Sequence, residues 1–363
     1  MNVVLVSSAG RCGINEYSAI LRAGFEAAGH RARHIGVERE VKADLYTRMR
    51  EVAPDDNIVI FEYIPGVFKL QHLVPLMADL RFRQHKQVYL SIHEMPLHGF
   101  DEYRYIQSRL MEPSWQRSWK EPIHLTIGAY KVAKAYATLR IYLSLVGILS
   151  HRIVVHSPLG QQMAVLVTAN ESKLHYVPHV VKPLEGDRND IRRELGLSAD
   201  AFAFIVAGFL FRRKRIPEII NQLPPGAELW VVGTTSPFDP GCLEEIQSHL
   251  AYSGKQNQVR IIQDYENMER YLVAADAAVL YYSELYQSGV ISQAIGARKP
   301  SIFSDLPGFI DVREAGIPVS NNAQLRQALI DIQEPARYAQ LAAAAGRLRD
   351  SLSPAHIGQA YLS

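Results

Sequence analysis

Residues 281–294 combine acidic, hydroxyl and glycine residues in a spacing that suits an anion and a sugar. The stretch reads Tyr-Tyr-Ser-Glu-Leu-Tyr-Gln-Ser-Gly-Val-Ile-Ser-Gln-Ala. A strand-like run is followed by a loop with Glu284, and a helix is predicted to begin near Ser288. Backbone amides of Ser288, Gly289 and Val290 would face an anion, and the helix dipole would add to the attraction. Glu284 would accept hydrogen bonds from sugar hydroxyls beside it. A simple helix cap explains Ser288 but neither Glu284 nor Gly289.

A basic run, Arg-Arg-Lys-Arg at 212–215, follows Gly208 near the end of another strand-like run. Such runs are commonly solvated faces. Here its place at a strand's carboxyl end favours a phosphate clamp, in which Arg213 and Lys214 donate charge-assisted hydrogen bonds. The sequence contains no Asp-x-Asp, so we expect a diphosphate to be neutralised by these cations and by helix amides, without a metal.

Two glycines, Gly10 and Gly13, lie between the first apolar run and a predicted helix. Their G-x-x-G spacing is not the G-x-G-x-x-G of dinucleotide-binding proteins, and Glu38 comes later than the usual ribose-binding acid. This argues against a nicotinamide enzyme. The glycines either let backbone approach a ligand near Gly13 or form a tight turn.

Residues 93–98, His-Glu-Met-Pro-Leu-His, do not match a zinc-protease motif. Their histidines are five apart, and Pro96 would break the helix needed to align them. His93 and Glu94 instead follow the apolar run 88–92, and carboxyl ends of parallel strands line the ligand crevice of doubly wound sheets. His93 either faces a ligand or is a structural histidine with satisfied hydrogen bonds.

Composition and pattern indicate a two-domain α/β protein. The chain has 363 residues, 48% of them hydrophobic, and a net charge of +2, which argues against nucleic-acid binding. Two distant cysteines and the lack of a secretory signal predict a cytoplasmic protein. Helical patterns alternate with apolar runs, which indicates parallel sheets; the runs are 3–7, 58–63, 87–93, 152–156, 202–207, 229–233, 259–262, 277–282 and 301–304.

A polar stretch with proline and glycine, 182–190, marks a boundary between halves of similar size. We predict an N-terminal domain over 1–183, a C-terminal domain over 184–345 and a helical tail over 346–363. The apolar segment 126–149 contains too many cations to span a bilayer. We favour a helix buried on the first sheet; the alternative is a basic, aromatic face that contacts a membrane peripherally.

Taken in order, these motifs resemble family-4 retaining glycosyltransferases of the GT-B fold. The resemblance covers most of the chain; the segments that carry it are 13–17, Gly29-His30, 154–157, 177–180, Gly208 with Lys214, Gly233, Ala275-Asp276, Glu284 and Lys299-Pro300. It implies two Rossmann-like domains facing each other across a cleft, with the donor bound mainly to the second domain and the acceptor to the first.

The resemblance implies transfer of a hexose from a nucleoside diphosphate sugar, GDP-mannose or a UDP-sugar, with retention of anomeric configuration. The acceptor would be a glycan or lipid-linked glycan in surface polysaccharide synthesis, at the inner face of the membrane, and no metal cofactor is implied. Arg213 and Lys214 would stabilise charge on the leaving diphosphate, while Glu284 and His93 would contact the sugar.

The remaining predicted contacts follow from the same resemblance. The donor-binding residues are Gly13, Gly208, Arg212, Gln263, Tyr265, Gln287, Ser288, Gly289, Val290 and Ser292, and the acceptor-binding residues are Glu94, Tyr103 and Trp115.

Two departures from the family pattern leave alternatives open. Phe209 stands where many relatives carry arginine, so Arg212 or Arg213 would have to replace it. Ser292 stands where relatives carry the second glutamate of an E-x7-E pair. The chain could therefore bind a nucleotide sugar or a partner without catalysis. A third alternative is an enzyme that acts on nucleotide sugars without an acceptor.

Overall fold

The computed structural model describes residues 1–10, 13–38, 41–64, 67–93, 121–167, 171–236, 239–284 and 288–363, with backbone alone for some positions of 121–167. The chain divides into two compact units, Met1–Val177 and Pro178–Ser363. This division falls a few residues before the predicted boundary. The assignment of acceptor and donor to the two domains stays a prediction.

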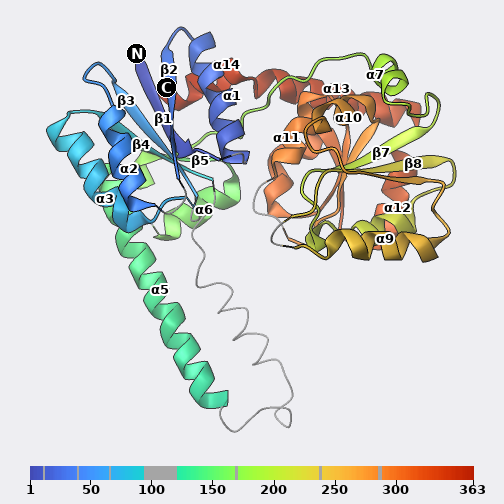
Figure 1. Ribbon diagram of the computed structural model, residues 1–363, viewed down its shortest axis with the longest axis horizontal. Coiled ribbons are helices and arrows are strands. Elements are labelled where there is room, and N and C mark those ends of the chain that lie inside the picture. Colours follow the sequence, from blue (N-terminus) through green and yellow to red (C-terminus); the bar gives the residue numbers. More distant parts are fainter. Residues whose placement is uncertain are drawn as a thin grey trace. The chain divides into compact units, whose positions relative to one another are not determined.

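Unit 1 contains a six-stranded sheet in the order β2-β1-β3-β4-β5-β6, and its strand pairs are all parallel (Figure 1). Its strands are β1 (Asn2–Ser8), β2 (Arg31–Val37), β3 (Ile58–Tyr63), β4 (Gln87–Ile92), β5 (Arg152–Val155) and β6 (Leu174–Tyr176). Its described helices are α1 (Gly13–Ala27), α2 (Lys42–Arg48), α3 (Leu70–Ala78), α5 (Glu121–Leu149) and α6 (Pro158–Val167).

Unit 2 repeats this architecture with a parallel sheet in the order β12-β11-β10-β7-β8-β9. Its strands are β7 (Phe202–Ala207), β8 (Ala227–Val232), β9 (Val259–Ile262), β10 (Ala277–Leu280), β11 (Ser301–Ser304) and β12 (Gly316–Val319). Its described helices are α7 (Arg188–Glu194), α8 (Ile216–Gln222), α9 (Cys242–Ser253), α10 (Met268–Ala274), α11 (Gly289–Gly296), α12 (Asn322–Asp331), α13 (Pro335–Ser351) and α14 (Pro354–Leu362).

Helices cover both faces of the unit 2 sheet, which explains its continuous apolar runs. Phe204 and Val206 of β7 pack into a core with α8, α9 and α12. Ala203 and Ile205, which point to the opposite face, pack with α10, α11 and α13 (Figure 1). Both sides of each strand are therefore apolar, as the sequence predicts for a covered parallel sheet.

Three strands, β2, β6 and β12, lie outside the nine apolar runs. Each lies at an edge of its sheet. The β2 sequence, RARHIGV, is mostly half-buried, and β12 is only four residues long and contains Pro318. Edge strands have one neighbour and less cover, so they need fewer apolar residues and tolerate proline.

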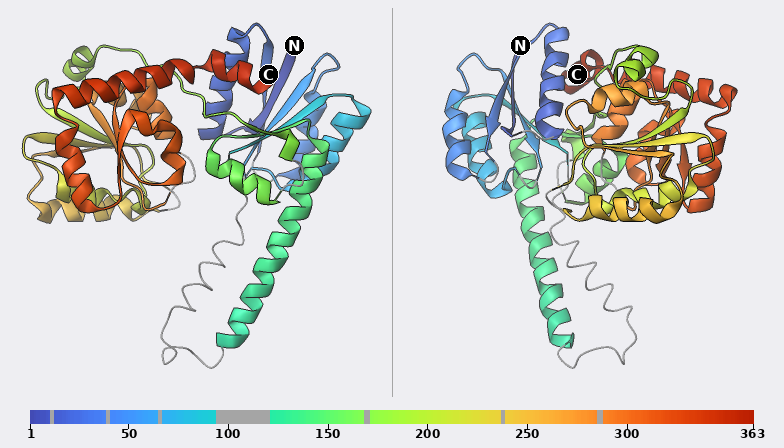
Figure 2. Two further views of the ribbon diagram at one scale, coloured as in Figure 1. Left: turned by 180° about the vertical axis from the view of Figure 1, so that it is seen from behind. Right: turned by 45° about the vertical axis from the view of Figure 1, so that its right-hand side comes forward.

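The C-terminal end of helix α5 is partly buried. Leu143, Val146 and Leu149 are buried, whereas Ile141 and Ile148 are more than half exposed. In Figures 1 and 2, α5 extends away from the sheet of unit 1. One face of this end is therefore buried, as predicted, but its main neighbour is α3 rather than the sheet, and the other face carries exposed apolar side chains. Within the described residues, no helix is long and apolar enough to cross a membrane.

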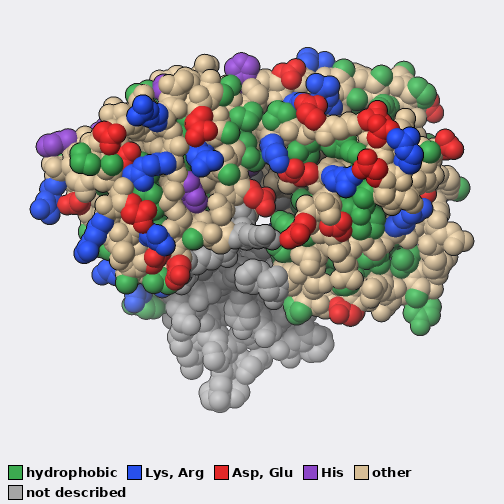
Figure 3. Space-filling model, turned by 45° about the horizontal axis from the view of Figure 1, so that its top comes forward, with side chains coloured by type: hydrophobic (Ala, Val, Ile, Leu, Met, Phe, Trp, Pro, Cys, Tyr) green, Lys and Arg blue, Asp and Glu red, His purple; other side chains and the backbone are tan. Residues whose placement is uncertain are grey.

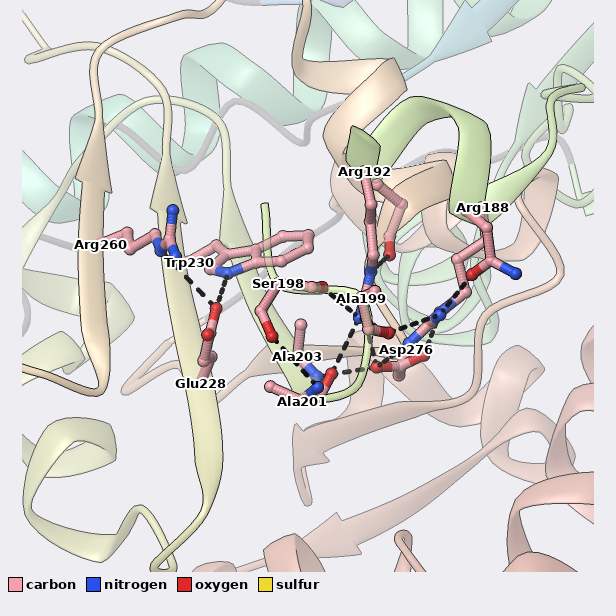
Figure 4. A network of polar contacts seen from close by, with 12 residues as sticks. Arg188, Arg192, Ser198, Ala199, Ala201, Ala203, Glu228, Trp230, Arg260 and Asp276 are labelled. Atoms are coloured by element: carbon pink, nitrogen blue, oxygen red, sulfur yellow. Dashed lines mark hydrogen bonds and ion pairs between the residues drawn. The ribbon is translucent and has the colours of Figure 1, made fainter. Parts of the chain in front are cut away.

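A buried charge network fixes the start of β7, the strand that leads into the candidate site. The Asp276 carboxylate accepts hydrogen bonds from Arg188 Nε at 2.7 Å, from Arg192 Nη2 at 2.8 Å and from the Ala203 amide at 2.7 Å (Figure 4). The Arg192 guanidinium is also 5.0 Å from the Trp230 ring. The carboxylate of Asp276, the residue before β10, thus joins α7 to β7.

Arg192 is 1% exposed, so its charge depends on these contacts. Its remaining hydrogen bonds go to backbone carbonyls, which lie on Ala274, Ser198, Ala199 and Ala201. Removing the anionic partner of a buried cation is far more costly than removing an exposed one. On the face drawn in Figure 3, by contrast, acidic and basic side chains are interspersed at the surface, where water solvates them.

We expect Asp276→Asn to lower the free energy of unfolding of unit 2 by about 3 kcal/mol, because it leaves Arg192 buried without an anion. Hydrogen exchange of β7 and β10 peptides in urea measures this. The control is Asp305→Asn, which breaks an exposed pair with Arg313 and should cost less than about 1 kcal/mol. Equal losses in the two variants would contradict the role of the network.

Candidate functional site

Three elements of unit 2 meet at the carboxyl end of β7. Gly208 follows β7, Lys214 lies in the next turn, and Val290 lies in the first turn of α11. A Cβ on Gly208 would be 3.2 Å from Val290 Cγ2 and 3.3 Å from Lys214 Nζ, and Gly208 has a φ of +92°. Glycine therefore allows the strand end, the cation and the helix N-terminus to approach one another closely.

Lys214 is the buried cation of this site. Its ammonium donates to the Ala207 carbonyl at 2.5 Å and lies 6.0 Å from the centroid of the Tyr282 ring. Burial, together with the charge of Arg213, lowers the pKa of Lys214 to about 7. Among the described residues, no carboxylate forms a salt bridge with it. A bound anion would supply the missing negative charge.

The two neighbouring arginines are held differently. Arg212 donates through Nε to Glu245 at 2.6 Å and also forms an ion pair with Asp239. The guanidinium of Arg213 lies 4.6 Å from the Phe211 ring, and its charge acts on both Lys214 and Tyr282. Since two carboxylates already compensate Arg212, Arg213 is the stronger candidate for an anion contact; both assignments stay predictions.

The N-terminus of α11 lacks a side-chain cap. Ser288 occupies the N-cap position, but its hydroxyl accepts no hydrogen bond from the helix amides. Burial raises the pKa of Tyr282 to about 12, and the hydrogen bond with Ser288 opposes that shift. The Ser288 hydroxyl thus forms a hydrogen bond with Tyr282. The backbone amides of Gly289 and Val290, at the start of the helix, are not capped by the Ser288 side chain. Such amides favour an anion.

Ser292, which corresponds to the second glutamate in the family that the sequence resembles, lies on the first helical turns of α11. Its hydroxyl is 3.3 Å from His179 Nδ1. The two residues come from separate motifs singled out in the sequence, and the structure brings them together. Neither carries a carboxylate, so a ribose contact of the usual acidic kind is not available from this pair.

The other predicted donor residues lie near the carboxyl ends of the unit 2 strands. Gln263 directly follows β9 and is exposed, and Tyr265 is half-buried. The Tyr265 ring packs in a tilted arrangement against Phe209, with ring centroids 4.9 Å apart. Glu284 is exposed in the loop after β10, next to Ser283, whose amide donates to the Arg213 carbonyl at 2.8 Å. Their contacts with a donor stay predictions.

Unit 1 has a polar cluster of its own at the carboxyl edge of its sheet. His93 follows β4, as predicted, and its Nε2 is 2.5 Å from Glu62 Oε2 on β3. Ser91 Oγ lies 3.2 Å from His93 Nε2 and 2.9 Å from His156 Nε2. Sequence analysis did not select Glu62 or His156 as site residues. An acid within the otherwise apolar run 58–63 was the signal for Glu62.

Gly13 begins α1, and Tyr17 on the same helix packs edge-on against His93 with ring centroids 4.5 Å apart. The role of Gly13 stays a prediction. Four predicted site residues lie outside the described part of the chain, namely Glu94, Tyr103, Trp115 and Gln287.

The cluster offers ligands of the kinds that hold zinc. One ligand atom each from Glu62, His93 and His156 lies within 4.8 Å of the others. In the present geometry, however, hydrogen bonds to Glu62 and Ser91 already occupy the two Nε2 atoms. The prediction that the protein works without a metal stays untested.

Comparison with models of known protein families and with curated proteins gives no match. Several solved structures are similar over almost the whole chain. HepE of Anabaena in complex with UDP has a TM-score of 0.72, 13% identity, and coverage of 100% of this chain and 98% of its own. Sucrose-phosphate synthase of Thermosynechococcus elongatus has a TM-score of 0.65, 16% identity, and coverage of 99% and 96%.

The third neighbour is WaaG, a glycosyltransferase involved in lipopolysaccharide biosynthesis, with a TM-score of 0.61, 13% identity, and coverage of 99% and 98%. Identities this low establish the fold and not the activity. Two parallel six-stranded sheets flanked by helices, together with these neighbours, show that the chain has the GT-B fold of glycosyltransferases.

From pH 7 to pH 9, we expect the free energy of unfolding of the wild type to rise by about 2 kcal/mol relative to that of Lys214→Met. The folded-state pKa of Lys214 is about 7, below its ordinary value. The unfolded chain therefore binds more protons over this interval, and the wild type gains stability as the pH rises. Urea unfolding at both pH values measures this difference.

The matched control is Lys255→Met, because Lys255 also donates to a backbone carbonyl, that of Leu223, but is only half-buried. Its gap to the wild type should stay constant between the two pH values. A constant gap for Lys214→Met as well would show that the ammonium remains fully charged in the folded protein.

Proposed function

We propose that the protein is a retaining glycosyltransferase that uses a nucleoside diphosphate sugar. The observation that carries the proposal is the convergence of Gly208, Lys214 and the N-terminus of α11. This arrangement provides a close backbone approach, a buried cation without a carboxylate partner among the described residues, and helix amides that Ser288 does not cap. A diphosphate matches all three features.

The same groups suit the chemistry of sugar transfer. When the bond between the anomeric carbon and the diphosphate breaks, negative charge grows on the leaving oxygen. Lys214 and Arg213 would stabilise that charge, and an anion beside Lys214 would stabilise its protonated form. Preorganised charge of this kind is commonly a large part of catalysis.

Retention is part of the proposal, and its support is the sequence resemblance. A retaining enzyme with a nucleophile would need a carboxylate at the anomeric carbon. Glu284 is proposed instead to hold sugar hydroxyls, so we favour a front-face reaction in which the departing diphosphate oxygen takes the acceptor proton. The transferred group would be a hexose.

The donor base is proposed from the neighbours. HepE is described in complexes with UDP and with UDP-glucose, which favours a UDP-sugar over GDP-mannose, the other donor that the sequence resemblance implied. Phe209 and Tyr265 offer a pair of packed aromatic rings near Gln263 for either base.

The acceptor is proposed to be a glycan or lipid-linked glycan in surface polysaccharide synthesis. Ile141, Leu145 and Ile148 are exposed on α5 at i, i+4 and i+7, and thus share one face of the helix. Lys134, two helical turns before Ile141, is exposed on the same face. This apolar and basic face supports a peripheral contact with the cytoplasmic side of a membrane, where a lipid-linked acceptor would be reached.

The second candidate function is binding of a nucleotide sugar or a partner without catalysis. Phe209 in place of arginine and Ser292 in place of glutamate favour it. The buried, energetically costly position of Lys214 argues against loss of the phosphate site, because a protein that no longer binds phosphate would gain nothing from burying a cation there.

A thermal-shift panel tests the proposed donor site. UDP, GDP, ADP and their common sugar conjugates are compared with the corresponding monophosphates, with and without chelator. A ligand at about 100 times its Kd should add about 2.7 kcal/mol of apparent stability. We expect one nucleoside diphosphate to stabilise the wild type despite chelator, and Lys214→Met to lose most of that effect.

Turnover of the selected donor then separates the alternatives. Transfer only in the presence of a glycan acceptor supports the glycosyltransferase. Consumption of donor alone would identify an enzyme without an acceptor, and binding without turnover would identify the non-catalytic alternative. If no nucleotide stabilises the protein, the proposed donor site is wrong.

A further inference from the structure

The stretch 281–294 begins with two tyrosines that the proposed function does not use. Tyr281 and Tyr282 directly follow β10, and both are buried. Tyr281 packs into the core with α8, α9 and α12, whereas Tyr282 packs into the core with α10, α11 and α13. The start of α11 lies on the second of these faces, since Ile291 belongs to the same core as Tyr282. Tyr282 is therefore the one of the two that lies on the side of the helix N-terminus.

Two successive cations of the basic run lie beside these two tyrosines. The Lys214 ammonium is 6.0 Å from the centroid of the Tyr282 ring, and the Arg215 guanidinium is 4.1 Å from the centroid of the Tyr281 ring. The face of an aromatic ring attracts a cation at such distances. The Tyr282 ring thus helps to hold the buried cation of the candidate site.

The Tyr282 side chain is itself held by its neighbours. The residue is 5% exposed, and the centroid of its ring is 6.0 Å from that of Phe309. Its backbone carbonyl accepts a hydrogen bond from the buried Ser304 hydroxyl at 2.6 Å. Backbone and ring are therefore packed against β11 and the helical turn that follows it. The phenol hydroxyl is presented at a defined place beside the start of α11.

This hydroxyl engages the N-cap residue of α11. Ser288 has the extended backbone that is usual for an N-cap, with φ −130° and ψ 114°, yet its side chain makes no capping hydrogen bond. It forms a hydrogen bond with Tyr282 instead. An N-cap serine ordinarily accepts from the amide of the second or third helical residue, here Val290 or Ile291. A serine that capped α11 would thus occupy an amide that an anion could use.

We propose that Tyr282 is a positioning residue, whose hydroxyl draws the Ser288 side chain away from the first amides of α11 and so leaves them open to a diphosphate. This inference rests on the proposed function, in which those amides and Lys214 bind the donor. Without Tyr282, the site would contain a helix cap that competes with its own ligand. Tyr282 acts through Ser288 and needs no contact with the donor.

A double-mutant cycle in the full chain tests the proposal through binding. Tyr282→Phe keeps the ring beside Lys214 and removes the hydroxyl, so Ser288 becomes free to cap α11. We expect affinity for UDP, or for the nucleoside diphosphate that the thermal-shift panel selects, to fall about fivefold, the equivalent of the ~1 kcal/mol of a serine cap. In the Ser288→Ala background, which has no hydroxyl to form a cap, Tyr282→Phe should cause no further loss. Equal losses in both backgrounds, measured by calorimetry, would overturn the proposal.

The matched control is Tyr281→Phe. The Tyr281 hydroxyl donates to Asn322 Oδ1 at 2.9 Å, and its ring packs on the other face of the sheet. This variant also removes a tyrosine hydroxyl and its hydrogen bond at the end of β10, but it releases no capping group at α11. Affinity should therefore stay at the wild-type value. A loss equal to that of Tyr282→Phe would contradict the proposed route through Ser288.

Hydrogen exchange in the ligand-free protein gives a readout that needs no nucleotide. A cap would supply an acceptor to the amide of Val290 or Ile291, so Tyr282→Phe should slow exchange of at least one of these amides severalfold. Adding Ser288→Ala should abolish the slowing. Nuclear magnetic resonance of 15N-labelled protein resolves the two amides. Exchange that is unchanged at both amides in Tyr282→Phe would overturn the proposal.

The two proposals can fail separately. If the wild type binds no nucleoside diphosphate, the proposed function fails, and hydrogen exchange still decides whether Tyr282 keeps α11 uncapped. If the wild type binds and transfers sugar but Tyr282→Phe acts equally with and without the Ser288 hydroxyl, the positioning role fails while the proposed function stands. Thermal unfolding checks that each variant is folded.

Discussion

Burial of the Lys214 ammonium without a salt bridge from the described residues is the constraint on which the account of unit 2 depends. A charged group in such a place is costly, and burial accordingly lowers its pKa to about 7. The fold holds it there through the Ala207 carbonyl, with Gly208 leaving room beside it. The Asp276 network fixes the other end of the same strand at Ala203. β7, with contacts at both of its ends, thus presents a cation whose charge an anion would stabilise.

Each unit places a buried ionisable side chain at the carboxyl edge of its sheet, a lysine in unit 2 and a glutamate in unit 1. Each is a parallel sheet covered by helices, so the carboxyl edge is where polar side chains collect. Unit 2 places a buried cation there, and unit 1 places a buried acid, Glu62, whose partner is His93. In both clusters a backbone carbonyl accepts a hydrogen bond, that of Ala207 from Lys214 and that of Val177 from His156 Nδ1.

Much of this organisation could be predicted from the sequence, because covered parallel strands leave continuous apolar runs. The edge strands β2 and β12 have no continuous apolar run in the sequence, because they are less covered by neighbouring elements. In the candidate site, Gly208, Lys214 and the start of α11 were found through their place after strands. The network of Asp276 with Arg188 and Arg192 could not be found, because it joins residues nearly 90 positions apart, and spacing carries no sign of it. His156 was missed for the same reason, because its partners depend on strand order. Glu62 did leave a signal, as an acid within an otherwise apolar run, but its partner His93 also depends on strand order.

The most direct test of the central claim is calorimetric titration of the protein with a nucleoside diphosphate at pH 8, in two buffers of different ionisation enthalpy. Lys214 is mostly neutral there, and a bound diphosphate should raise its pKa, so binding should take up a proton. The account predicts uptake approaching one proton per nucleotide, greatly reduced in Lys214→Met. Binding with the same proton count in the wild type and in Lys214→Met would contradict it.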